Sequence, residues 1–238
     1  MYVKYHIMKV LLKKYIPEFF VIVFSISISF YLDDFRQKQE LKYLSKDLKV
    51  NLFNELLEIE KYLAEREKAF TGDLIILNAL QSKKISFDSI IKLESNPDKY
   101  KVAVFDYRGF MPPVAFYKSL VNDGKIRYLE STELKEELDI MHNGHNYFIT
   151  MNIKDESVAQ KKVIDYFQVN YPNLFVRDDG FSGTDYIKQL KASINNDIRL
   201  KSIINQKLIA MDNKIVGFRF YQESLVKLKN LLSTNSKS

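Results

Sequence analysis

The longest uncharged run of the chain lies near its N-terminus, from Phe19 to Leu32. A helix of this length covers about 21 Å at ~1.5 Å per residue. A hydrocarbon core of ~30 Å needs about 20 residues, so the run approaches that length once residues 15–18 are added. Aromatic residues lie at both ends of the extended segment, as they do at membrane interfaces. The pattern predicts a transmembrane signal anchor over residues 15–32.

Three other interpretations of this segment are less consistent with its residues. A cleaved signal peptide needs a small-residue site after the apolar region, and Tyr31-Leu32-Asp33 offers none. A buried helix of a soluble protein would gather its polar residues on one face, but the serines at positions 25, 27 and 29 alternate with apolar residues. An interfacial helix needs a strongly charged face, which the run lacks. A single uncleaved anchor is the favoured interpretation.

The charges on either side of the anchor indicate its orientation. Residues 1–14 form a basic N-terminal arm that carries four lysines and no acid. Cytoplasmic segments beside a membrane span are enriched in Lys and Arg. Lysines at positions 38, 42 and 46 follow the span, so the bias is modest. We predict a bacterial inner-membrane protein with its N-terminus in the cytoplasm and its C-terminal domain outside it.

One face of the predicted anchor carries a glutamate and two serines. On a helix, Glu18, Ile22, Ser25 and Ser29 follow one another at steps of four, three and four, so they share a face. Small residues four apart allow two membrane helices to approach closely. This transmembrane packing face therefore predicts self-association. The alternative is that Glu18 lies at the level of the lipid headgroups and that the serines face lipid.

The residues after the anchor predict a long helix. Gly (7) and Pro (5) are scarce in the 238 residues, which favours helices over a β-rich fold with many turns. Neither occurs between residues 33 and 70, and leucine or isoleucine recurs there at steps of three and four. The repeat departs from strict heptads, which favours packing in a core over a two-stranded coiled coil. The stripe consists of Leu41, Leu44, Leu48, Leu52, Leu56, Ile59 and Leu63.

The complete prediction is an all-α chain. One N-terminal transmembrane helix continues into the long amphipathic helix, and an antiparallel helical bundle follows, so that the bundle domain covers residues 33–232 and a frayed tail covers residues 233–238. We expect the long helix to break at residues 71–73 and a short helix to be capped near Ser86. We expect an ordered loop over residues 95–112, a helix over residues 152–167, and a last helical region over residues 185–232 with a weak point at Gly217.

Residues 113–151 carry the clearest local pattern, a predicted helical hairpin. A helix would contain Leu120 and end in a turn at Gly124, and a short apolar link would contain Ile126. Ser131 is a favourable N-cap for the next helix. That helix would place Glu133 in its first turn, where a carboxylate is stabilised by the helix dipole, and Leu134 on its inner face. We expect the two arms to pack antiparallel.

The predicted anchor and the predicted hairpin resemble a family of single-pass membrane proteins of Bacteroidota that is catalogued as domain of unknown function 6090. In that family the membrane segment begins with Gly-Glu and exits on Asn-Asn-Trp. Here Pro17-Glu18 opens the segment and Asp33-Asp34-Phe35 closes it. The family's middle motif is similar to residues 117–138, although Asp123 replaces a small residue before the turn. The resemblance implies a membrane-anchored helical domain and no particular activity.

Candidate catalytic and metal-binding residues are few. His142 and His145 are three apart, but no second cluster of ligands accompanies them, so exposed polar residues at a helix end are the favoured interpretation. The segment from Asp178 to Asp185 lacks the alternate acidic ligands of a calcium loop. There is no Cys and no phosphate-binding glycine loop. We therefore predict no catalytic residue, no metal and no cofactor.

The most favoured function is a membrane-anchored helical interaction or structural module. Its expected partners are the lipid bilayer, a second copy of the chain and a protein that the sequence does not identify. The alternative is an oligomeric membrane effector or channel-like subunit that assembles through Glu18, Ser25 and Ser29. The net charge is +6, and basic residues accumulate after residue 186. Nucleic-acid binding is nevertheless disfavoured, because it would require the bundle to lie in the cytoplasm.

Overall fold

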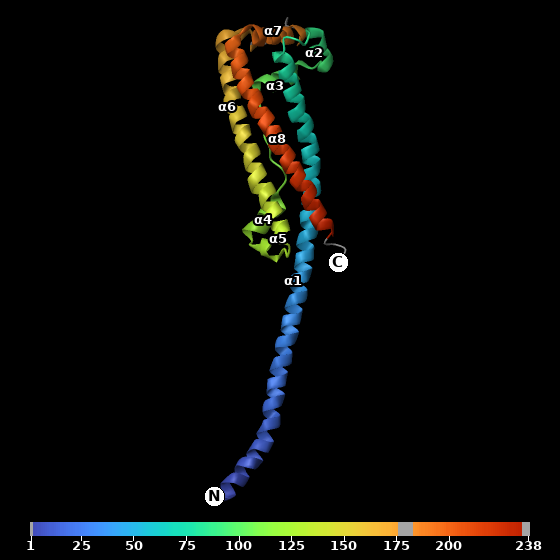
Figure 1. The fold of residues 1–238 in the computed structure, drawn as a ribbon, viewed down its shortest axis with the longest axis vertical. Coiled ribbons are helices and arrows are strands. Elements are labelled where there is room, and N and C mark those ends of the chain that lie inside the picture. The colour runs from blue at the N-terminus through green and yellow to red at the C-terminus, as the bar shows by residue number, and fades with distance from the viewer. Residues whose placement is uncertain (1, 176–182, 235–238) are drawn as a thin grey trace.

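Three long helices dominate the computed structural model, which describes residues 2–175 and 183–234, with side chains over residues 18–175 and 183–233. They are α1 (Tyr2–Gln81), α6 (Asn146–Asn170) and α8 (Ile198–Thr234). Every regular element in the described part of the chain is helical, which confirms the all-α prediction. Helix α8 packs along both α1 and α6, while the first half of α1 projects alone from the body (Figure 1).

Short helices close the two ends of this body (Figure 1). Helices α2, α3 and α7 lie at the end far from the N-terminus, and α4 and α5 lie at the end from which α1 emerges. A π-helical segment, η2, joins α5 directly to α6. The bounds of these elements are α2 Phe87–Leu93, α3 Pro97–Phe105, α4 Ala115–Asn122, η1 Lys125–Tyr128, α5 Thr132–Asp139, η2 Ile140–His145, η3 Pro172–Leu174 and α7 Gly183–Asn196.

The predicted stripe of α1 enters the core, as expected. Leu48, Leu52, Leu56, Ile59 and Leu63 are buried, Leu44 is half-buried and Leu41 is exposed, so the body begins near residue 44. The buried apolar side chains form two clusters. The first contains this stripe and residues of α5 and the second half of α8. The second contains the end of α1 with residues of α3, α7 and the first half of α8.

Helix α1 does not break at residues 71–73, so that prediction was wrong. Gly72 lowers helix stability by about 1 kcal/mol relative to alanine, but packing overrides this preference. Phe70, Ile76, Leu77 and Leu80 lie on both sides of Gly72 and are buried. Most helix stability in proteins comes from packing of this kind, so the helix runs through the glycine to Gln81.

Residues 97–105 form helix α3, although a loop was predicted there. The sequence contains the start signals of a helix: Asn96 is the N-cap, its side-chain oxygen accepts a hydrogen bond from the Asp98 N–H at 2.9 Å, and Pro97 occupies the first turn. Three apolar residues, Tyr100, Ala103 and Val104, are buried against the second cluster. Their spacing of three and four is helical, which excludes the alternating pattern of a strand.

The last helical region breaks at Asp197, and Gly217 is not a weak point. The Asp197 carboxylate accepts hydrogen bonds from the N–H groups of Arg199 (2.9 Å) and Leu200 (3.1 Å), so it caps the start of α8. Gly217 lies in the uninterrupted α8. A Cβ atom there would lie 2.6 Å from the Phe148 ring and 3.0 Å from Ile149, so the glycine allows α6 and α8 to approach closely.

Candidate functional site

The projecting half of α1 exposes every apolar side chain from Phe19 to Leu32 and also Phe35. Phe30, for example, is 72% exposed. Monomeric soluble proteins rarely expose contiguous apolar surfaces of this kind, and such surfaces mark sites of interaction. This apolar projection is therefore one candidate site.

No helix is both long enough and apolar enough to cross a membrane within the part of the chain that the structure describes. This finding does not support the predicted membrane span. The predicted span covers residues 15–32, and the side chains of residues 15–17 lie outside the described residues.

The predicted packing face lies on the surface of this projection. Glu18, Ile22, Ser25 and Ser29 are all exposed, and α1 runs as one helix through them. The hydroxyl of Ser25 donates to the Val21 carbonyl (2.7 Å) and that of Ser29 to the Ser25 carbonyl (2.9 Å). Because these hydroxyl groups are bonded within their own helix, they need no partner from another element. Packing of this face on another helix stays a prediction.

The predicted hairpin residues occupy the end of the body from which α1 emerges. Leu120 and Leu134 are buried, and Ile126 is half-buried. Gly124 has a φ of 65°, in the left-handed region that favours glycine. The Ser131 hydroxyl accepts a hydrogen bond from the Leu134 N–H at 3.1 Å, which confirms the N-cap. The exposed carboxylate of Glu133 lies 3.5 Å from the Lys227 ammonium on α8.

The two arms of this motif do not pack on each other as a hairpin. Helix α4 packs on α1 and η1, whereas α5 packs on α8 and η2. The reason is a carboxylate of α1: Glu55 accepts hydrogen bonds from the N–H groups of Phe116 (2.5 Å) and Tyr117 (2.9 Å), which fixes the start of α4 on α1. Burial raises the pKa of Glu55, although both N–H groups oppose this shift.

A layer of charged side chains separates the two apolar clusters. Asp73 lies between Phe70 and Ile76 on α1, and Lys214 lies between Met211 and Phe218 on α8. In each case one neighbour belongs to the first cluster and the other to the second. We call this group the charge layer; its members are Asp73, Arg108, Glu156, Lys207 and Lys214.

Two ion pairs form part of the charge layer. The Lys214 ammonium donates to the Glu156 carboxylate and lies 4.3 Å from the centre of the Phe70 ring. Glu156 is 2% exposed and Lys214 is 1% exposed. Arg108 makes a bidentate contact with Asp73, in which Nη2 donates to Oδ1 at 3.0 Å. Buried charges are stable only when they are paired in this way.

Lys207 has backbone carbonyls as its hydrogen-bond partners. Its ammonium donates to the oxygens of Ala103 (2.8 Å), Val104 (3.0 Å) and Asp106 (2.5 Å), at the C-terminal end of α3. These carbonyls have no partner within their own helix. Burial lowers the pKa of Lys207 to about 8. The amine therefore caps α3 from α8, a contact between segments about a hundred residues apart in sequence.

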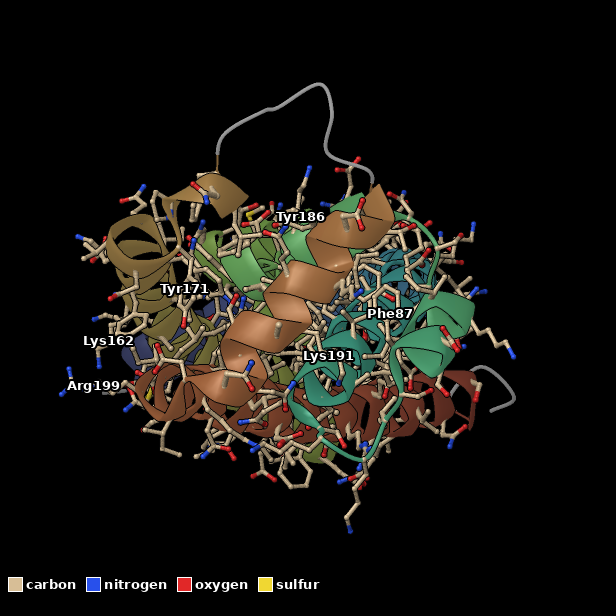
Figure 2. The ribbon with its side chains drawn as sticks, turned by 90° about the horizontal axis from the view of Figure 1, so that it is seen from above. Phe87, Lys162, Tyr171, Tyr186, Lys191 and Arg199 are labelled. Carbon is tan, nitrogen blue, oxygen red and sulfur yellow. The ribbon has the colours of Figure 1, made fainter. Side chains whose placement is uncertain are left out.

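Similar contacts close the far end of the body, where α7 crosses the ends of the long helices (Figure 2). The Lys191 ammonium of α7 donates to the Ser82 carbonyl at 2.7 Å, and the Asn195 amide donates to the Leu80 carbonyl at 2.7 Å. The Tyr171 hydroxyl, at the other side of this end, donates to Asp197 at 3.0 Å. The polar groups of this end thus complete helix termini.

The two candidate metal-binding histidines lie in different surroundings. His142 is 7% exposed and stacks on the Tyr117 ring with 4.0 Å between ring centres. Its Nδ1 lies 3.4 Å from the Tyr221 hydroxyl, while its Nε2 has no hydrogen-bond partner in the described part of the chain. His145 instead faces Phe220, with 5.8 Å between ring centres. Residues 18–175 and 183–233 contain no cluster of potential metal ligands, and residues 178–182 of the other candidate loop lie outside them.

The burial of His142 predicts a loss of stability in acid. Burial lowers the pKa of His142 to about 4, against 6.5 for a free imidazole. As the pH falls from 6.5 towards 4, the unfolded chain takes up a proton that the folded chain does not bind. Between pH 7 and 5 we expect the wild type to lose about 2 kcal/mol more unfolding free energy than His142→Phe. Urea unfolding at each pH measures this difference.

The matched control is His145→Phe, which removes the half-buried imidazole and leaves His142 in place. We expect its unfolding free energy to follow the wild-type pH profile. Parallel profiles for the wild type and His142→Phe would contradict the assignment of the acid sensitivity to His142.

A shallow groove of about 290 Å³ runs between α6 and α8 on the outer surface. Ala159 and Ala210 form part of its floor and are buried. Val158 and Ile209 stand on its two sides and are 52% and 53% exposed. The sequence alone does not identify Val158 and Ile209 as surface residues, because each is one apolar residue within a helix. Their exposure depends on how α6 and α8 pack side by side.

Comparisons of the chain with protein-family models, with curated proteins and with solved structures find no match. The family resemblance therefore stays a prediction.

Proposed function

We propose that the chain is a membrane-anchored helical module of the bacterial envelope. Residues 15–32 would form a single anchor, the N-terminus would lie in the cytoplasm, and the helical body would lie on the other side of the membrane. The observation that carries this proposal is the apolar projection of α1. Its exposed side chains from Phe19 to Leu32 have no partner in the body and would gain from transfer into lipid.

The segment between the anchor and the body supports the same arrangement. Residues 33–43 of α1 are exposed and touch no other element in the described part of the chain. The Lys38 ammonium lies 2.6 Å from Asp34, and Arg36 lies 3.4 Å from Glu40. Pairs four residues apart stabilise an isolated helix by about 0.2–0.5 kcal/mol each. This charged stalk would hold the body about 16 Å from the membrane surface, at ~1.5 Å per residue.

A second candidate function is an oligomeric membrane effector or channel-like subunit. Its support is the face formed by Glu18, Ser25 and Ser29, whose small side chains would allow two anchors to approach closely. A charged group inside a membrane is costly and often functional. Depolarisation of cells on overproduction, abolished by Glu18→Ala, would favour this alternative.

Fractionation tests the anchor directly. We expect the wild type to remain in the membrane pellet after alkaline carbonate extraction. Val23→Arg combined with Ile26→Arg places two guanidinium groups at the centre of the anchor, and each disfavours insertion by about 2.5–3.5 kcal/mol. The double variant should therefore move to the supernatant.

The control is Val226→Arg, which places the same charge on an exposed position of α8. It should remain in the pellet. Wild-type protein in the carbonate supernatant would refute the anchor. A compartment-sensitive reporter at the C-terminus tests the orientation separately, and a cytoplasmic signal would reverse it.

A further inference from the structure

Helix α6 carries a stripe of exposed residues. Its members follow one another at alternating steps of three and four, the spacing by which helices pack on each other. The stripe is exposed along its whole length. It consists of Phe148, Met151, Asp155, Val158 and Lys162.

Helix α8 carries a second exposed stripe with the same alternating steps. This stripe is separate from the buried residues of α8, such as Leu208, Met211 and Phe218, which pack in the core. Its three apolar members, Ile209, Val216 and Phe220, remain 53%, 41% and 45% exposed in the body. The stripe consists of Gln206, Ile209, Asn213, Val216 and Phe220.

The two stripes lie side by side and their residues match level by level. At one end the Lys162 ammonium donates to the Gln206 side-chain oxygen at 3.2 Å. Val158 and Ile209 line the same groove at the next level. Because the helices are antiparallel, each step along α6 corresponds to a step back along α8. Asp155 and Asn213 line the groove at the third level. Beyond the groove, the same steps along the two helices lead to Met151 and Val216 and then to the apolar end formed by Phe148 and Phe220. At that end the Phe220 ring also lies 5.8 Å from the His145 ring.

We propose that this two-helix face binds the same face of a second copy of the chain, with the two-fold axis parallel to α6 and α8. Under this symmetry α6 of one copy meets α8 of the other at the same level. Apolar levels then meet apolar levels. At the two polar levels, the Asp155 carboxylate meets the Asn213 amide and the Lys162 ammonium meets the Gln206 carbonyl. A surface that complements itself in this way is what a two-fold interface requires.

The opposite orientation fits the side chains less well. If the second copy were reversed about the central level, Phe148 and Phe220 would meet Lys162 and Gln206, so that aromatic rings would bury charged and amide groups. Burying a polar group without a hydrogen bond costs about 1–3 kcal/mol. The parallel arrangement avoids this cost and also places the N-terminal ends of both copies on the same side.

The size of the face indicates how strong the dimer is. Fifteen residues of helix are about 22 Å long and two helices are about 20 Å wide, so each copy would bury on the order of 400 Å² and the dimer about 800 Å² in total. This lies below the ~1,200 Å² total of stable interfaces, and the face alone forms a weak dimer. Two copies anchored in one membrane gain effective concentration. The dimer in the membrane thus rests on the proposed anchor, whereas the face itself does not.

Cysteine crosslinking tests the face, because the chain has no cysteine of its own. Two single-cysteine full-length chains with different tags are produced together and oxidised in membranes. Val158→Cys with Ile209→Cys should give mixed dimers, since these residues share a level. Val158→Cys with Phe220→Cys should give at least about tenfold fewer, because the two levels lie about 16 Å apart.

A charge on the face should prevent the dimer. Ile209→Lys introduced into both chains, with Val158→Cys and Asn213→Cys as reporters, should lower the yield about tenfold or more. Val226→Lys is the matched control, on the same helix and equally exposed but outside the stripe. Circular dichroism confirms that both variants remain helical.

The results separate this proposal from the anchor. Equal yields for matched and mismatched pairs, or no mixed dimer at all, would overturn the two-fold face. If Val226→Lys lowered the crosslink yield and Ile209→Lys did not, the interface would lie elsewhere and the proposed face would be overturned. If the chain fractionates as a soluble protein, the anchor fails, and the same pairs are compared in solution at high protein concentration, where matched crosslinks would still support the face.

Discussion

Replacing Glu156 by leucine is expected to lower the free energy of unfolding by about 3–5 kcal/mol, because it leaves the Lys214 ammonium buried without a carboxylate. Lys214 is 1% exposed, so water does not take the place of Glu156. The reverse change, Lys214→Met, leaves the Glu156 carboxylate buried and should cost a similar amount. Urea unfolding followed by circular dichroism measures both values.

The double variant Glu156→Leu/Lys214→Met is the informative comparison. Both charges are removed and the volume is roughly conserved, and replacing a buried ion pair in this way is often neutral or stabilising by 1–4 kcal/mol. We expect the double variant to be more stable than either single variant, and Asp165→Leu, an exposed position on α6, to change stability by less than about 0.5 kcal/mol. If the double variant lost as much unfolding free energy as the two single variants together, that result would contradict direct coupling between Glu156 and Lys214.

The second large effect concerns Lys207 and depends on pH. Its pKa is about 8 in the folded chain, against about 10.4 for an unperturbed lysine. Between these values the unfolded chain holds a proton that the folded chain has released, so stability rises with pH. Relative to Lys207→Met, the wild type should gain about 1–2 kcal/mol between pH 7.5 and 9.5.

The comparison with Lys207→Met is made because other groups also titrate in alkali. Burial raises the pKa of Tyr100 to about 12, so the contribution of Tyr100 to the unfolding free energy falls as the pH rises above 10. Both proteins contain Tyr100, so this contribution cancels in the comparison. Lys201→Met, which changes a half-buried lysine on the same helix, is the control. It keeps Lys207, so its unfolding free energy should follow the wild-type pH profile. A constant difference between the wild type and Lys207→Met across this pH range would contradict the shifted pKa.

The sequence predicts those parts of this fold that depend on neighbours along the chain. The apolar stripe from Leu48 to Leu63 and the N-caps Ser86 and Ser131 are local patterns, and the structure confirms all of them. Helix α3 also has local start signals, Asn96 at the N-cap and Pro97 in the first turn. A loop was nevertheless predicted there, although a cap followed by proline is a signal for the start of a helix.

The charge layer could not be predicted in the same way, because it depends on residues distant in sequence. In the sequence, Lys207 and Lys214 are two of the basic residues that accumulate after residue 186, yet both are buried in the body. One signal was available: they lie seven apart and three residues after Ile204 and Met211, on the buried side of α8. The helical periodicity predicts that such positions face the core. Only the tertiary structure supplies the carbonyls and the carboxylate that accept hydrogen bonds from the two ammonium groups.

The continuity of α1 has a mechanical consequence. No turn interrupts the helix between Glu18 and Gln81. The projecting end therefore cannot rotate about the helix axis independently of the body. Each residue of helix contributes about 100° of rotation. The face that carries Ser25 and Ser29 therefore points in one fixed direction relative to the face of α6 and α8. The number of residues in the charged stalk, eleven, sets the angle between these two faces. The length of the stalk thus specifies direction as well as reach.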